Sequence, residues 1–287
     1  MNPISCKEIL KKFMVAALLS FALTQNADAQ SVPANDNLNA TLWIQKSVEF
    51  KANAQSAFAL AKFRLEQGLA HPEWTALPEE QKGAYKDLPP AIIVDVDETV
   101  MDNSRYQAWT IVNDKAFDQD SWAKFCHAKV SEAVPGAAEF LRYANSRGVK
   151  VFYVSNRTHD LEESTRENMQ RLGFPLGGNV DTLLFSKEQK DWGSAKSTRR
   201  AYVAKDYRVV LNIGDNFGDF TDAYKGTEAE RLKVMNDNQE RWGREWIVIA
   251  NPSYGSWESA FFKHDFKIPL DEQRKLKRQG LDAWNGN

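Results

Sequence analysis

Residues 89–104 read PPAIIVDVDETVMDNS, and this stretch decides the fold. Four apolar residues, 91–94, run directly into Asp95 and Asp97. A short apolar run that follows two prolines is typical of a strand buried on both faces of a parallel sheet. Aspartate is uncommon in strands and costly to bury. The two carboxylates at the end of this strand therefore indicate a functional site.

Further apolar runs alternate with helical patterns along the chain. The predicted strands after the first are 149–155 (VKVFYVS), 182–185 (TLLF), 208–215 (RVVLNIGD) and 245–251 (EWIVIAN). The predicted helices are 135–148, 160–172, 192–204 and 273–284. This alternation is typical of an α/β fold. We expect a three-layer, Rossmann-like parallel sheet with helices on both faces.

The rest of the chain predicts a smaller, mainly helical cap domain. Residues 103–132 lie between the first two strands and are rich in aromatic side chains, so we expect them to form an insertion above the carboxyl edge of the sheet. The predicted organisation is an α/β core of 91–102 and 133–257, a cap insertion of 103–132, an N-terminal helical region of 30–90 that contributes to the cap, and a C-terminal helical segment of 258–287.

The N-terminus has the pattern of a secretory signal peptide. Three lysines precede an apolar run of 13–24, and the small-residue sequence ADA ends at Ala29. A run of this length is too short to span a bilayer, and a buried core helix is the alternative. We expect cleavage after Ala29, which leaves residues 1–29 as the signal peptide and an exported protein, periplasmic or secreted. Cys6 precedes the apolar run, so a lipoprotein is not evident.

The charge balance bears on the partners of the protein. The formal net charge is -2 over 287 residues, of which 26% are charged. Such a balance provides no electrostatic basis for binding a nucleic acid polymer or an anionic membrane. No other segment is long and apolar enough to predict a transmembrane helix.

Polar residues follow three of the predicted strands. Ser155 and Asn156 end the second, and the motif GDNFGDF at 214–220 places Asp215 and Asp219 after the strand at 208–215. The carboxyl ends of parallel strands meet at one edge of a sheet, so we expect these side chains to converge on Asp95 and Asp97.

Clustered carboxylates repel one another unless a cation neutralises them, and all-oxygen ligands suit a hard ion such as Mg²⁺. A bound phosphate also needs hydroxyl, amide and ammonium donors. Ser155 supplies a hydroxyl, and a lysine near the start of the 192–204 helix supplies an ammonium. Lys196 is the preferred candidate, and Lys187 is the alternative.

This order of motifs resembles that of the haloacid dehalogenase-like (HAD) phosphotransferases: strand-DxD, strand-Ser, Lys, strand-GDxxxD. The segments DVDETVMDNSRY (95–106), GDNFGDF (214–220) and NPSYGSWE (251–258) resemble the class C nonspecific acid phosphatases, the four-aspartate family that includes bacterial lipoprotein 5′-nucleotidases. The resemblance extends over about residues 38–263. It implies a Mg²⁺-dependent acid phosphatase for phosphomonoesters, with nucleoside 5′-monophosphates as the expected substrates. It also implies a homodimer.

The resemblance implies a role for each site residue. Asp95 would be the nucleophile that forms an aspartyl-phosphate, and Asp97 the general acid and then the general base. The implied metal ligands are Asp95, Asp97, Asp215 and Asp219. Asp97 would bind through its backbone carbonyl, Asp215 directly, and Asp219 through a water molecule or as a support for the other ligands. Ser155, Asn156 and Lys196 would bind the phosphate. Tyr106, Trp122 and Tyr254 would hold the organic part of the substrate by stacking.

Three questions stay open at this level. The first is whether Arg157 contacts phosphate or is a solvated loop arginine. The second is whether the substrates are instead sugar phosphates or phosphoproteins, handled by a phosphatase or phosphotransferase on the same scaffold. The third is whether the protein is a non-catalytic storage or binding relative of these enzymes.

Overall fold

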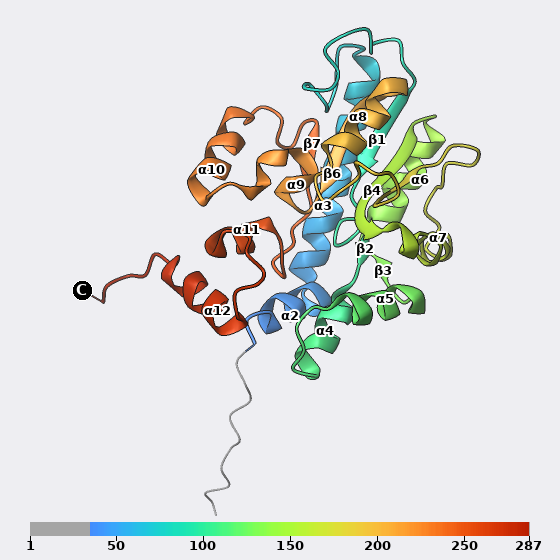
Figure 1. The fold of residues 1–287 in the computed structure, drawn as a ribbon. Coiled ribbons are helices and arrows are strands. Elements are labelled where there is room, and N and C mark those ends of the chain that lie inside the picture. The colour runs from blue at the N-terminus through green and yellow to red at the C-terminus, as the bar shows by residue number, and fades with distance from the viewer. Residues whose placement is uncertain (1–34, 287) are drawn as a thin grey trace, which may run out of the picture. The chain divides into compact units, whose positions relative to one another are not determined.

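A five-stranded parallel sheet lies at the centre of the part of the chain that the computed structural model describes, residues 35–286 (Figure 1). The strand order is β5-β4-β1-β6-β7, and every neighbouring pair is parallel. The strands are β1 (Pro90–Val94), β4 (Lys150–Thr158), β5 (Leu183–Ser186), β6 (Arg208–Gly214) and β7 (Trp246–Val248). The predicted α/β class is confirmed.

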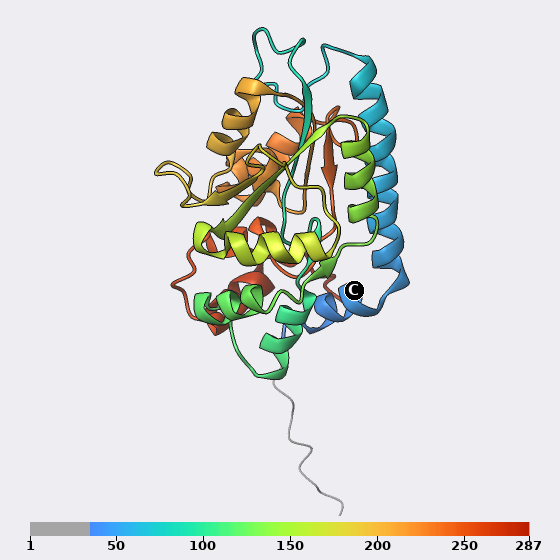
Figure 2. The ribbon, with the colours of Figure 1, turned by 90° about the vertical axis from the view of Figure 1, so that its right-hand side faces the viewer.

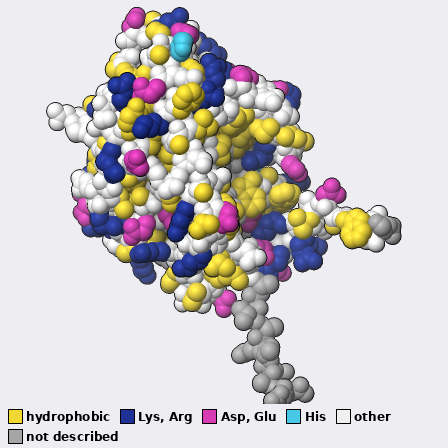
Figure 3. All heavy atoms as spheres, turned by 180° about the vertical axis from the view of Figure 1, so that it is seen from behind, with side chains coloured by type: hydrophobic (Ala, Val, Ile, Leu, Met, Phe, Trp, Pro, Cys, Tyr) yellow, Lys and Arg dark blue, Asp and Glu magenta, His cyan; other side chains and the backbone are white. Residues whose placement is uncertain are grey.

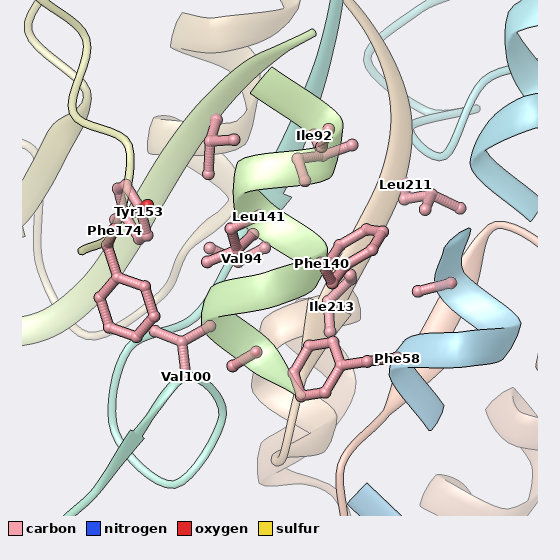
Figure 4. Close-up of a cluster of buried hydrophobic side chains, with 14 of the residues drawn as sticks. Phe58, Ile92, Val94, Val100, Phe140, Leu141, Tyr153, Phe174, Leu211 and Ile213 are labelled. Carbon is pink, nitrogen blue, oxygen red and sulfur yellow. The ribbon is translucent and has the colours of Figure 1, made fainter. Parts of the chain in front are cut away.

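Successive side chains of β1 point to opposite faces of the sheet, as the pleat requires. Ile92 and Val94 join a core cluster with α3 (Val48–Ala70) and α6 (Ala137–Ser146), which Figure 4 shows in part. Ala91 and Ile93 join a second cluster on the other face, where α8 (Ser197–Asp206) and α9 (Phe217–Phe220) pack. The two covered faces make the three layers visible in Figure 2.

Helix α3 belongs to one of these layers because its sequence presents an apolar stripe. Ala54, Phe58, Ala61 and Leu65 are buried at helical spacing. Gly68 permits a close approach to the sheet, because a Cβ there would lie 2.3 Å from Val210 Cγ1. The sequence predicts that residues 30–90 contribute to the cap. In that region α2 (Leu38–Lys46) packs against α4 (Ser104–Val112) of the cap insertion, whereas α3 packs on the sheet.

The cap insertion consists of α4 (Ser104–Val112) and α5 (Gln119–Ala128). Its centre is Tyr106, whose ring lies between 5.1 and 6.1 Å from four other aromatic rings: Trp109, Phe117, Trp122 and Phe125. An antiparallel pair of short strands, β2 (Met101–Asp102) and β3 (Glu132–Ala133), joins the ends of this insertion where the chain leaves and re-enters the core.

The remaining helices differ in detail from the prediction. The 160–172 helix is the 3₁₀ turn η1 (His159–Leu161) followed by α7 (Glu162–Arg171). Helix α8 begins at Ser197 instead of Trp192, because residues 187–196 form turns around the buried Trp192 ring. Helix α12 (Leu270–Gln279) begins directly after Pro269, three residues before the predicted start at 273. Three short helical elements remain: η2 (Asp222–Lys225), α11 (Ser256–Ser259) and η3 (Ala260–Phe262).

Helix α10 (Glu228–Asp237) was not predicted. No residue of this helix is buried, so it lacks the apolar period that we used to find helices. Its sequence signal is the capping box formed by Thr227 and Glu230, which satisfies the first free amides. A search for caps would have found it.

Two further predictions concern the surface and the N-terminus. Basic and acidic side chains are interspersed on the face shown in Figure 3, in line with the small net charge. Within residues 35–286, none of the helices combines the length and the apolar character that crossing a bilayer requires. The predicted signal peptide, 1–29, lies outside the described residues.

Candidate active site

A cavity of about 540 Å³ opens where the carboxyl ends of β1 and β6 meet. It brings together residues from segments that are more than a hundred positions apart in the sequence. Six of the predicted catalytic, phosphate-binding and metal-binding residues line it: Asp95, Asp97, Asn156, Lys196, Asp215 and Asp219.

The backbone of β1 holds Asp95 in place. Its amide continues the sheet by donating to the carbonyl oxygen of Ile213 at 2.9 Å. Its carboxylate is buried, accepts a hydrogen bond from Thr99 Oγ1 at 3.0 Å, and forms an ion pair with Lys196. Burial raises the pKa of Asp95 to about 6, against the opposing charge of Lys196.

Lys196, and not Lys187, is the lysine that reaches the carboxylates. Its Nζ lies 2.6 Å from Asp219 Oδ1 and also contacts Asp95. Burial alone would lower the pKa of Lys196, but Asp219 and Asp95 outweigh it and the pKa is raised. Lys196 is therefore a buried ammonium, whereas Lys187 is exposed to solvent.

Asp219 is positioned by the first turn of α9. Its Oδ2 accepts from the Asn216 amide at 2.9 Å, and its carbonyl oxygen accepts from Asn212 Nδ2 of β6, also at 2.9 Å. The carboxylate passes so close to the end of β6 that a Cβ on Gly214 would lie 2.2 Å from Asp219 Oδ2. The glycine of the GDNFGDF motif is therefore required by this contact.

Asp215 completes a group of three carboxylates. Oxygens of Asp95, Asp215 and Asp219 all lie within 4.8 Å of one another. Burial, together with the charges of Asp95 and Asp219, raises the pKa of Asp215 well above its ordinary value. Its Oδ2 accepts from Asn251 Nδ2 at 2.8 Å. Neither Asn251 nor Thr99 was among the predicted site residues, although both fall in the quoted motifs.

This donor set fits a divalent cation. The buried Asp95 and Asp219, the half-buried Asp215 and the Lys196 ammonium together carry a formal charge of -2. Burial first, and then the neighbouring carboxylate charges, raise the pKa values of Asp95 and Asp215. All of the offered ligand atoms are oxygens, which hard cations prefer. Asp97 offers no carboxylate oxygen to this group of three.

The Asp97 side chain instead faces Arg157. Asp97 Oδ1 accepts from Arg157 Nε at 2.9 Å and Nη2 at 2.8 Å, and from Asn103 Nδ2 at 2.8 Å. Arg157 is 3% exposed, so it is not a solvated loop residue. Ser155 is also buried, and its Oγ lies 3.4 Å from Asp97 Oδ2.

Asn156 reaches the cavity from the end of β4. Its Nδ2 donates to the carbonyl oxygen of Ser194 at 3.0 Å, and its Oδ1 accepts from Arg199 Nη2 at 2.7 Å. Arg199 is fully buried, and burial lowers its pKa to about 10. We did not predict Arg199, because an arginine in a polar helix carries no distinctive sequence signal.

Of the three predicted substrate-binding aromatic residues, only Tyr254 lines the cavity. Its hydroxyl donates to Glu98, a buried carboxyl at positive φ whose pKa is raised to about 8 by burial and by the charge of Asp97. Tyr106 and Trp122 lie in the aromatic cluster of the cap. Neither of them is among the residues that line this cavity, where the other aromatic residues are Tyr224 and Phe266.

Solved structures with the same fold come from class C acid phosphatases. The class C acid phosphatase from Bacillus anthracis is 31% identical in sequence, with a TM-score of 0.76 over 87% of this chain and 98% of that chain. A structure of the same enzyme with tungstate bound has a TM-score of 0.76 and 30% identity over the same shares of the two chains. Fold and site together define a phosphomonoesterase.

The family model described as "HAD superfamily, subfamily IIIB (Acid phosphatase)" matches residues 5–257. The chain belongs to this family of acid phosphatases, which confirms the resemblance that the motifs predicted. Phosphatases of this superfamily use a divalent metal, and the three-carboxylate cluster fits one.

Proposed function

We propose that this protein is an exported, Mg²⁺-dependent acid phosphatase that hydrolyses nucleoside 5′-monophosphates through an aspartyl-phosphate on Asp95. The observation that carries the proposal is the cluster of Asp95, Asp215 and Asp219 with Lys196 at one end of an open cavity. Phosphoryl transfer requires a positioned nucleophile together with positive charge from a cation and an ammonium beside the phosphoryl group.

The reaction proceeds in two steps on this chain's own residues. A carboxylate oxygen of Asp95 attacks phosphorus, the ester P–O bond breaks, and Asp97 gives a proton to the leaving alkoxide. Asp97 then takes a proton from water, which attacks the phosphorus of the aspartyl-phosphate, releases inorganic phosphate and regenerates Asp95. Lys196 balances charge on the phosphoryl oxygens throughout. When bound, Mg²⁺ supplies the remaining positive charge.

Two observations support an oxyanion subsite at this place. Tungstate, which is bound in the related Bacillus anthracis enzyme, is a tetrahedral oxyanion like phosphate. Lys196 and Asn156 line the cavity with the carboxylate cluster, and the buried Ser155 lies 3.4 Å from Asp97 Oδ2. We assign the phosphate to the space between them.

The nucleotide preference rests on the aromatic wall of the cavity. Tyr254, Tyr224 and Phe266 line it beside the carboxylates. Stacking of a base on an aromatic face contributes roughly 1–3 kcal/mol. We therefore propose Tyr254 with these two residues as the base-binding surface, and the roles of Tyr106 and Trp122 in substrate binding stay predictions.

Export and dimerisation are proposals from the sequence. Export predicts that the protein isolated from periplasm or medium begins at Gln30, which N-terminal sequencing would show. The homodimer predicted by the resemblance would appear as twice the monomer mass in light scattering.

A phosphate-release assay tests the reaction. We expect wild-type protein to hydrolyse nucleoside 5′-monophosphates with Mg²⁺, to lose activity in EDTA, and to recover it when Mg²⁺ is restored. Asp95→Asn should lower kcat by at least about 10³-fold, because an amide cannot attack phosphorus. Lys190→Gln, a change at an exposed lysine outside the cavity, is the control. Equal turnover by Asp95→Asn would remove Asp95 from its role, and turnover of sugar phosphates but not nucleotides would favour the alternative substrate class.

A further inference from the structure

We propose that Arg157 is a positioning residue that, with Asn103, turns Asp97 so that its Oδ2 alone delivers the proton to the leaving group. The inference rests on the proposed function, in which Asp97 is the general acid. It assigns a role to a buried arginine that the reaction steps above do not use.

The two oxygens of Asp97 have different surroundings. Oδ1 accepts three hydrogen bonds at 2.8–2.9 Å, two from Arg157 and one from Asn103. Oδ2 has only a long contact of 3.4 Å, with Ser155 Oγ. A carboxylate oxygen offers about two lone-pair sites, so three donors leave no room for a proton on Oδ1. A proton carried by Asp97 must therefore reside on Oδ2.

Arg157 is held in place by further contacts besides those with Asp97. Its Nη1 donates to Thr165 Oγ1 at 2.9 Å, and its Nη2 also contacts Asn103 Oδ1 at 3.2 Å. The guanidinium carbon lies 5.2 Å from the centre of the Trp122 ring, in a cation–π contact. The hydrogen bonds to Asp97, Thr165 and Asn103 together use four of the five N–H groups of the guanidinium. Arg157 thus has little capacity left for a substrate phosphate, and its geometry is that of a support.

Asn103 is fixed equally well. It is fully buried, and its Oδ1 accepts a hydrogen bond from Ser131 Oγ at 2.7 Å. Its backbone N–H donates to Glu98 Oε1 at 3.1 Å. The support of Asp97 therefore comes from β4 on one side and from the base of the cap insertion on the other. Trp122, through its contact with Arg157, connects the aromatic cluster of the cap to the acid.

The consequence depends on the leaving group. General acid catalysis contributes about 10²–10⁴-fold when the departing oxygen needs a proton. The alkoxide of a nucleoside 5′-monophosphate needs one, whereas p-nitrophenolate is stable without it. A misplaced Asp97 should therefore slow the first reaction far more than the second, which a general loss of structure would not do.

The experiment compares kcat/KM for adenosine 5′-monophosphate and p-nitrophenyl phosphate in the Mg²⁺-loaded enzyme. This ratio of rate constants reports the steps up to departure of the leaving group. We expect Arg157→Ala to lower the nucleotide value about 10²-fold more than the p-nitrophenyl value. Arg157→Lys should recover only part of the loss, because lysine cannot make the two-pronged contact. Arg147→Ala is the control, since it removes an arginine–carboxylate pair on the surface, with Glu66.

Three outcomes are decisive. Equal losses for both substrates in Arg157→Ala would overturn the positioning role. Asp97→Asn should show the same leaving-group dependence; if it does not, Asp97 is not the acid and the proposed function fails first. Should Arg157→Ala not fold, Thr165→Val loosens the same guanidinium, and an unchanged substrate ratio in that variant would overturn the inference.

Discussion

At Asp95 burial and charge act against each other. Burial raises the pKa of this carboxyl from 3.8 to about 6, Lys196 opposes the rise, and Asp219 and Asp97 add to it. In the metal-free protein the folded state therefore keeps a proton that the unfolded chain releases between about pH 4 and 6. Stability is highest below this window and falls as the pH rises through it. A shift of this size corresponds to roughly 3 kcal/mol.

The prediction at the residue scale concerns pH and metal. In EDTA, Tm should fall between pH 4 and pH 7, and Asp215, whose pKa is raised in the same direction, should add to the fall. Mg²⁺ should raise Tm more at pH 7 than at pH 4, because protons and metal compete for the same oxygens. Thermal unfolding followed by circular dichroism measures both effects. An equal gain in Tm at the two pH values would contradict the assignment, and Asp95→Asn should flatten the profile.

At the scale of elements, helix α3 packs directly against β6 of the sheet. Gly68 sits where α3 touches β6, and an added Cβ would lie 2.3 Å from Val210 and 3.0 Å from the Trp74 ring. Intrinsic helix propensity favours alanine over glycine by about 1 kcal/mol. The two effects have opposite signs, so a single substitution shows which one dominates.

We expect Gly68→Ala to lower the free energy of unfolding by roughly 1–3 kcal/mol, because overpacking outweighs propensity. Gly83→Ala is the matched control, since nothing lies within 4 Å of the Cβ that it adds. Urea unfolding of the two variants gives the comparison. If Gly68→Ala stabilised the protein, the close packing of α3 on the sheet would be wrong.

At the scale of the whole molecule, the cavity depends on segments distant in sequence. Tyr254 follows β7, yet its hydroxyl bonds to Glu98 in the loop after β1, and its ring lines the cavity with Tyr224 and Phe266. The hydroxyl and the ring therefore have separable functions. One satisfies a buried carboxyl, and the other offers a surface for a base.

Two substitutions at Tyr254 separate these functions. Tyr254→Phe should destabilise the protein by about 1–3 kcal/mol, because buried Glu98 loses a partner, but should leave KM for nucleotides nearly unchanged. Tyr254→Ala should raise KM for nucleoside 5′-monophosphates about tenfold and leave KM for methyl phosphate unchanged, since about 1.4 kcal/mol of stacking is lost. An equal rise in KM for both substrates would argue against base stacking. Trp122→Ala provides the comparison from the cap.

The sequence by itself determined the fold class and the family. Continuous apolar runs such as 91–94 specify buried parallel strands because burial on both faces leaves no polar alternation. Short motifs such as GDNFGDF can be interpreted from local sequence. Gly214 and Asp219 lie close together because a single turn joins them. Local patterns of this kind can be found without coordinates.

Only the tertiary structure decided which side chains meet across the fold. It brought Lys196 rather than Lys187 to Asp95, paired Arg157 with Asp97, and put Trp122 against Arg157. It also placed α3 on the sheet. Each of these contacts joins residues of different elements, and their pairing depends on packing and side-chain direction over the whole molecule, which no local period in the sequence encodes.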